Sequence, residues 1–199
     1  MVFDTIYSHK TRKVNRRFDP FNDFIGIGIW LLDVTGDVTL MRCTADNGTE
    51  GSIGIWLLDL DGNTIVQQCN ANDNEDGIWL TELSSEKAHV IRCSNMTGNK
   101  ECGLLLSMGN FAVEAANNWW GNASGPTHTS NPGGSGDDIC EEDYTGTVMF
   151  DPWLSGPYEL TSPCWIVPVP TVNQWGLILL SVGMAGAAVW TGRRRKRTF

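Results

Sequence analysis

Three tryptophans recur at matched places in the sequence, and an acidic residue follows each of them three positions later. The tryptophans are Trp30, Trp56 and Trp79, and the acids are Asp33, Asp59 and Glu82. Aromatic rings stack on the apolar faces of sugars, and carboxylates accept hydrogen bonds from sugar hydroxyls. These six are therefore candidate ligand-binding residues for a glycan. The alternative is that the N-terminal segment, a missing coil or a partner chain covers the tryptophans, which then serve only packing.

Other kinds of site find less support in the sequence. Lyase chemistry needs a base near aspartates that hold calcium and a uronate. The strong cations of the coils are Arg42, Lys87, Arg92 and Lys100, and Arg42 and Arg92 fall at equivalent repeat positions, which favours a solvated row over a catalytic site. No C-x-x-C pair occurs and the three histidines are scattered, so we expect no metal site. We predict no catalytic residues within this chain and no cofactor, with calcium held by the acid rows as the one option left open.

The cysteines suggest two arrangements. Cys43, Cys69 and Cys93 end equivalent runs and are expected to stack as small buried hydrophobes, although an adjacent pair would be close enough for a disulfide. Cys140 and Cys164 flank a predicted capping segment and are a candidate disulfide pair in an oxidising compartment.

The elements that must position these residues are short repeated strands. "GIWLLDVTGDVTLMRC", "GIWLLDLDGNTIVQQC" and "GIWLTELSSEKAHVIRC" repeat one unit, "GLLLSMGN" begins a fourth, and no helical periodicity intervenes. Units of 23 to 26 residues, with strands but no helix, indicate a β-solenoid with one unit per coil. The Ile and Leu on either side of each tryptophan should point inward, so that the tryptophans point outward in register.

A closing segment follows the repeats. It contains "NNWWGNASGP", "NPGGSGDD" and "FDPWL", and it resembles the end of right-handed parallel β-helix proteins of the pectin-lyase-like superfamily. The resemblance implies an all-β, right-handed parallel β-helix of about four coils with a C-terminal cap. We expect an N-terminal segment at 1–24, the coils at 25–118 and the cap at 119–155. That superfamily includes polysaccharide lyases and many non-catalytic surface proteins, so the fold leaves function open.

The C-terminal tail predicts a route to the membrane. Residues 175–192 carry no charge and precede RRRKR, which suits a single transmembrane helix with a cytoplasmic basic end. After a linker at 156–168, the segment 169–199 resembles IPTL-type sorting signals, which are related in layout to those processed by exosortases. The matching residues are Pro170, Thr171, Trp175, Gly176, Arg193, Arg194 and Arg195. The resemblance implies bacterial export, a membrane processing protease as partner, and transfer to the cell surface.

Charge restricts the partners of the body. Residues 18–192 hold four cations against 22 acids, a formal charge of −18. Nucleic acid is not expected as a partner, because binding to phosphates requires Lys and Arg. The first 24 residues contain no apolar signal core, so we expect a truncated or misassigned start, with the chain forming the C-terminal part of a longer protein.

These observations together predict an exported, cell-surface-sorted bacterial protein with a structural or adhesive role, in which glycan binding is a refinement. Two alternatives stay open. One is a fragment of a polysaccharide lyase or another carbohydrate-active enzyme on the same fold. The other is a surface scaffold whose stability depends on calcium.

Overall fold

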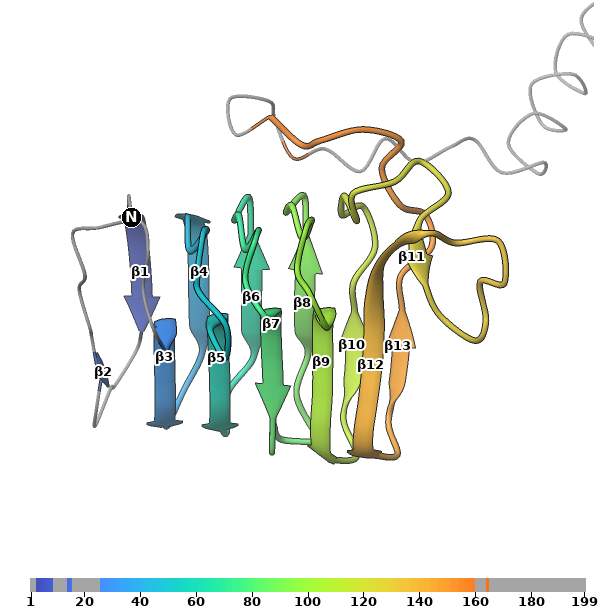
Figure 1. The fold of residues 1–199 in the computed structure, drawn as a ribbon. Helices are drawn as coiled ribbons and strands as arrows, with labels where there is room; N and C mark the ends of the chain where they lie inside the picture. Colours follow the sequence, from blue (N-terminus) through green and yellow to red (C-terminus); the bar gives the residue numbers. More distant parts are fainter. Residues whose placement is uncertain (1–2, 9–13, 16–25, 160–163, 165–199) are drawn as a thin grey trace, which may run out of the picture. The chain divides into compact units, whose positions relative to one another are not determined.

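The structure, a computed structural model, describes residues 3–8, 14–15, 26–159 and 164. These residues form an all-β parallel solenoid, as the sequence predicts (Figure 1). Within them, no helix has the length and hydropathy needed to cross a bilayer. The predicted transmembrane helix 175–192 and the sorting motif lie outside the described residues.

The strands form two sheets, one of seven strands and one of six. The seven-stranded sheet runs in the order β11 (Pro126–Thr127), β12 (Gly136–Tyr144), β9 (Cys102–Gly109), β7 (Asp76–Thr81), β5 (Ile53–Leu60), β3 (Ile27–Val34) and β2 (Val14–Asn15). The six-stranded sheet runs β1 (Phe3–Ser8), β4 (Val38–Cys43), β6 (Thr64–Gln67), β8 (His89–Arg92), β10 (Ala112–Glu114) and β13 (Thr147–Met149). Each coil contributes one strand to each sheet.

The core lies between the sheets and is built from rows of identical or similar side chains. Parallel pairing aligns Ile29, Ile55 and Ile78 with Leu104, and all four are buried. Leu31, Leu57, Leu80 and Leu106 form a second buried row two positions on. The predicted inward rows are thus confirmed, because side chains alternate between the two faces of a strand.

Left-handed residues turn the chain at the corners of each coil. Asp33, Asp59, Glu82, Met108 and Asp143 occupy one corner row, with φ between 50 and 55°. A second row is Arg42, Gln68, Cys93 and Asn117, and a third is Asn47, Asp73, Gly98 and Gly121, all with positive φ. Asp, Asn and Gly tolerate this conformation best, which explains the turn-rich composition between the β-prone runs.

Glycines at the start of the coils let neighbouring backbones approach closely. A Cβ added at Gly54 would lie 2.6 Å from the carbonyl oxygen of Gly77, and one at Gly77 would lie 2.5 Å from that of Gly103. No side chain fits at such distances without moving the next coil. The repeated glycines that mark the units in the sequence are therefore required by coil stacking.

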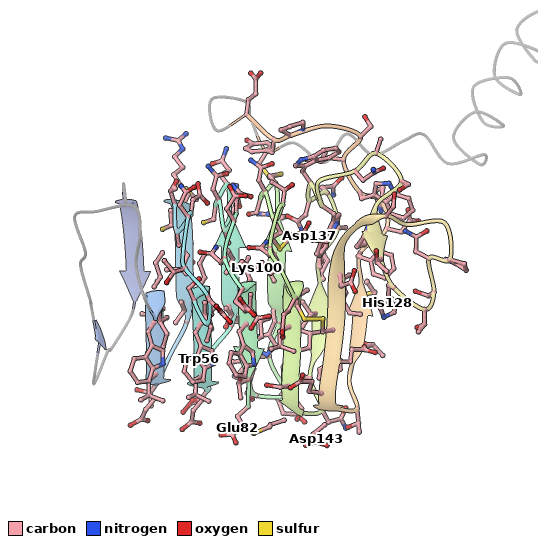
Figure 2. All side chains as sticks on the ribbon, in the orientation of Figure 1. Trp56, Glu82, Lys100, His128, Asp137 and Asp143 are labelled. Carbon is pink, nitrogen blue, oxygen red and sulfur yellow. A yellow bond between two sulfur atoms is a disulfide. The ribbon has the colours of Figure 1, made fainter. Side chains whose placement is uncertain are left out.

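Along a third side, isolated parallel backbone bridges link Thr44, Asn70, Asn95 and Trp119 from coil to coil. Side chains add to them, since Asn95 Nδ2 donates to Asn70 Oδ1 at 2.9 Å. Nearby, the Asn74 backbone N–H donates to Asn99 Oδ1 at 3.1 Å. The Asn99 backbone N–H in turn donates to Asp137 Oδ2 at 2.7 Å, and Asp137 is marked in Figure 2. These bonds satisfy backbone donors where the connections between sheets leave the regular ladders.

The solenoid has about three turns rather than the expected four. The fourth unit keeps its strands β9 and β10, but after Trp119 the chain leaves the coil path and forms β11. The nine-residue strand β12 and the three-residue strand β13 then close the described structure as a cap. At the other end, β2 pairs antiparallel with β3 and β1 pairs antiparallel with β4.

Candidate functional site

The three tryptophans form the predicted in-register ladder. Trp30, Trp56 and Trp79 are direct neighbours on β3, β5 and β7, and each is half-buried. The ring centroids of Trp30 and Trp56 lie 5.6 Å apart, and those of Trp56 and Trp79 lie 4.7 Å apart. The interplanar angles are 11° and 14°, so the rings stack face to face along the solenoid. Figure 2 marks Trp56, the central ring.

This stacking limits what the ladder can bind. Both faces of the Trp56 indole lie against other indoles, so a sugar could meet only its edge. The Trp56 indole N–H donates to Thr81 Oγ1 at 3.2 Å, and that of Trp79 donates to Ser107 Oγ at 2.6 Å. The ladder is therefore a packed aromatic column, and its stacked rings stabilise the coils. This arrangement favours the alternative in which the tryptophans serve packing.

Trp30 lacks the hydrogen bond that the other two indoles make. Its Nε1 is buried and has no partner among the described residues. The register of the strands explains the difference. In the third and fourth coils, Thr81 and Ser107 supply the hydroxyls that accept from Trp56 and Trp79, whereas the equivalent residue of the second coil, next to Trp30, is Leu58. The sequence shows this difference, but only the pairing reveals its effect.

The predicted acids form an exposed row at the first corner. Asp33, Asp59 and Glu82 are all exposed, and Asp143 of the cap extends the row. Figure 2 shows Glu82 and Asp143 at the same edge of the solenoid, beyond the end of the strands that carry the tryptophans. Met108 interrupts the row in the fourth coil. The structure thus aligns the acids with one another, while the ligand-binding role of the six residues stays a prediction.

The described residues contain no group of three or more His, Cys, Asp or Glu placed to hold a metal ion. The calcium hypothesis stays a prediction for the chain as a whole. The corner acids lie one per coil, so each has neighbours only along its own row. Calcium sites in proteins use six to eight oxygen ligands.

Asp76, at the start of β7, is an acid whose surroundings favour the protonated form. Burial raises its pKa to about 6, and the negative charge of Glu101 adds to the rise. Its Oδ1 is buried and lacks a partner. The carboxyl therefore ionises in the folded state at a higher pH than in the unfolded chain, where its pKa is about 3.9.

Asp76→Asn is expected to raise the free energy of unfolding at pH 7 by about 1 kcal/mol, a value reduced for partial solvent screening. An aspartate whose folded pKa is raised destabilises the fold increasingly as pH rises from about 4 to about 6. The gain should therefore be present at pH 7 and absent near pH 4. Thermal unfolding at both pH values measures it, with the exposed Asp61→Asn as control. Equal gains at both pH values would contradict the assignment.

The parallel coils, inward rows and corner rows have the arrangement expected of a β-solenoid. The family described as right handed beta helix region matches residues 4–120, more than half of the chain. This chain belongs to the right-handed β-helix family. The IPTL-CTERM motif matches residues 167–195, which include the predicted sorting residues Pro170, Thr171, Trp175, Gly176 and Arg193, Arg194 and Arg195. No curated protein and no solved structure matches the chain.

The disulfides of this β-helix differ from the predicted pair. Cys140 of β12 bonds to Cys102 of β9, and Cys164 bonds to Cys93 at the second corner of the third coil. The predicted Cys140–Cys164 bond is therefore wrong. Cys140 lies within the cap and Cys164 follows it in sequence, and each is bonded to a different coil. The sequence alone shows no partner for Cys102, because the return path of β12 beside β9 is a tertiary feature.

The predicted stack of Cys43, Cys69 and Cys93 is also wrong at its third member. Cys43 and Cys69 are buried free thiols in register, but the next residue in that row is Ser94. The Cys69 backbone N–H donates to Ser94 Oγ at 3.1 Å. Residues of β6 pair with residues 25 positions later in β8, as Gln67 does with Arg92. Cys93 follows Cys69 by 24 positions, one too few to be its neighbour. Cys93 therefore occupies the corner, where it meets Cys164.

A strap of residues 151–159, with Cys164 beyond it, runs back from the cap across the coils. Figure 1 shows it in orange. The Tyr158 backbone N–H donates to Asn95 Oδ1 at 2.7 Å, and Asn95 Nδ2 donates to the Tyr158 carbonyl oxygen at 2.9 Å. Gln68 Nε2 of the second coil donates to Tyr158 Oη at 2.6 Å. The chain thus approaches its sorting motif while bound to the side of the solenoid.

Proposed function

We propose that this protein is an exported structural module of the bacterial cell surface, in which the β-helix is the displayed body and the C-terminal motif is the sorting signal. The observation that carries the proposal is the Cys93–Cys164 disulfide, because it anchors the chain three residues before the matched motif begins at residue 167. The covalent tie to the body therefore ends, in sequence, close to the segment that we propose a processing protease recognises.

Two further features support export and a structural role. Disulfides form and persist in oxidising compartments such as the periplasm and the cell surface, and four of the six cysteines are paired. The rings of the tryptophan column stack on one another, and the indole N–H groups of Trp56 and Trp79 donate to hydroxyls within the protein. A rigid body of this kind suits display and spacing.

An adhesive role is the refinement of this proposal. The exposed row of Asp33, Asp59 and Glu82 would accept hydrogen bonds from a neutral hydroxyl-rich surface, with the edges of the indoles beside it. Polysaccharide cleavage is the weaker candidate for this chain, because lyase chemistry needs a base facing an acidic cluster. Such a site would have to lie in coils upstream of those described.

The test is to express the full chain behind an export signal in a bacterium that processes IPTL-type signals. We compare the wild type with a Trp175→Ala/Gly176→Ala variant and use Trp190→Ala, outside the motif opening, as control. The wild type and control should lose mass near the motif and become accessible to protease added outside the cells. The motif variant should keep its full mass and stay in the membrane fraction. The same mass and location for all three proteins would refute the proposal.

A further inference from the structure

A cavity of about 530 Å³ lies at the cap end of the solenoid, away from the tryptophan column. It is formed between the turn that follows β11, which contributes Ser130 and Asn131, and the segment from β13 to Trp153. Its volume falls within the range of about 300 to 1,000 Å³ typical of small-molecule sites. The residues that line it take no part in the predicted ladder or acid row.

The cavity exists because the solenoid ends there. Among the described strands, β13 is the last of its sheet, and its one partner is β10. No further coil among the described residues covers the side chains that follow it, and Met149 is 56% exposed. Only one other large hydrophobic side chain of the described residues, Met108, is as exposed. An uncovered apolar side chain beside a cavity is a common feature of binding sites.

Two aromatic rings form a rigid part of the cavity wall. The Trp153 indole N–H donates to the Ala123 carbonyl oxygen at 3.1 Å. The indole packs on Gly125, where an added Cβ would lie 2.5 Å from the ring. Phe150 is buried, with its centroid 6.3 Å from that of Trp153 and 5.2 Å from that of His128. The rings are therefore held in place before any ligand arrives.

The polar groups that line the cavity include oxygen acceptors and no cationic side chain, and the Ser130 hydroxyl pairs with His128 Nδ1 at 2.8 Å. Asn131 Nδ2 donates to the carbonyl oxygens of Ser124 and Pro126, at 3.0 and 2.8 Å, and these bonds fix the orientation of the amide. The described structure shows no bond to Asn131 Oδ1. The exposed carboxylate of Asp151 and the hydroxyl of Ser130 complete the polar lining.

We propose that this cavity binds a short neutral saccharide, of about disaccharide size. Sugar rings present apolar C–H faces, which suit the aromatic and methionine wall, and hydroxyl donors, which suit the oxygen acceptors. Asp151 and the absence of a lining cation disfavour uronates and other anions. The proposal does not depend on surface sorting. It places sugar recognition at the cap, at the aromatic wall formed by Phe150 and Trp153, and away from the stacked tryptophan column.

The test uses the full chain in a zwitterionic detergent, because glycosidic detergents would compete for the site. Saturation-transfer NMR and titration are run with the neutral disaccharides cellobiose, lactose, maltose and chitobiose. At least one should bind, and Met149→Ala and Asp151→Asn should each weaken it about tenfold. Trp153→Ala is avoided, since loss of its packing on Gly125 could unfold the cap.

Matched variants and probes decide the outcome. Met108→Ala and Asp61→Asn change equally exposed residues of the same types outside the cavity and should leave affinity unchanged. A glucuronate-containing disaccharide and Nα-acetyl-lysine amide serve as anionic and cationic probes and should bind more weakly than the neutral sugar. The proposal is overturned if no neutral disaccharide binds, if the control variants weaken binding as much as the cavity variants, or if either charged probe binds best.

Discussion

Replacing both Cys93 and Cys164 with serine is expected to lower the free energy of unfolding by about 4 kcal/mol. The bond closes a loop with a sequence separation of 71, and in the chain-entropy account a closed loop of that length restricts the unfolded state by this amount. Chemical denaturation of the wild type and the double variant under non-reducing conditions measures the difference. With a strong reductant present, the two proteins should become much more alike.

The same double variant should free the strap. Without the disulfide, the strap loses its covalent tie and keeps non-covalent contacts, among them the bonds of Tyr158 to Asn95 and Gln68, so local opening should expose its residues 157–159 to proteases. The matched control is Cys102→Ser/Cys140→Ser, which removes the other disulfide and leaves the strap anchored. Limited proteolysis followed by mass spectrometry should find strap cleavage in the first variant and not in the control. Equal protection in both would mean that the disulfide does not hold the strap.

Asn118→Ala is expected to lower the free energy of unfolding by about 3 kcal/mol or more. Asn118 is fully buried, and its Nδ2 donates to the carbonyl oxygens of Ile91 and Ala115, both at 2.7 Å. Its Oδ1 accepts from the Ser94 backbone N–H at 3.0 Å. Alanine would leave these three backbone groups buried and unpaired, and each such group costs about 1–3 kcal/mol.

Thermal and denaturant unfolding measure this effect, with the exposed Asn110→Ala as control. The control should change stability by less than about 0.5 kcal/mol, as is usual for surface substitutions. Asn118 also belongs to the segment that resembles the closing motif of parallel β-helix proteins. A small effect of Asn118→Ala would show that the last coil can rearrange to pair the backbone groups that Asn118 otherwise bonds. The prediction that these bonds stabilise the coil would then be wrong.

The proposed roles of the two ends of the molecule follow from the same architecture. Along the coils, identical neighbours stack on one another, so outward aromatic rings such as Trp56 are covered by their own kind. At the cap the stacking of the described coils stops, and within the part of the chain that the structure describes no following coil lies over Met149 and Trp153. Repetition therefore favours rigidity in the middle of a solenoid, and recognition of a ligand is easier at its end.

The sequence by itself determined the repeating unit, the inward Ile and Leu rows, and the register of Trp30, Trp56 and Trp79. It could do so because side-chain alternation belongs to each strand, and because similar units stack with like over like. The tertiary structure decided which cysteines pair, that Ser94 rather than Cys93 continues the thiol row, and that a cavity opens beside β13. These features depend on a one-residue change in coil length and on the path of the cap and strap. Both are set by contacts between segments far apart in the chain, and the local pattern of residues carries no signal for them.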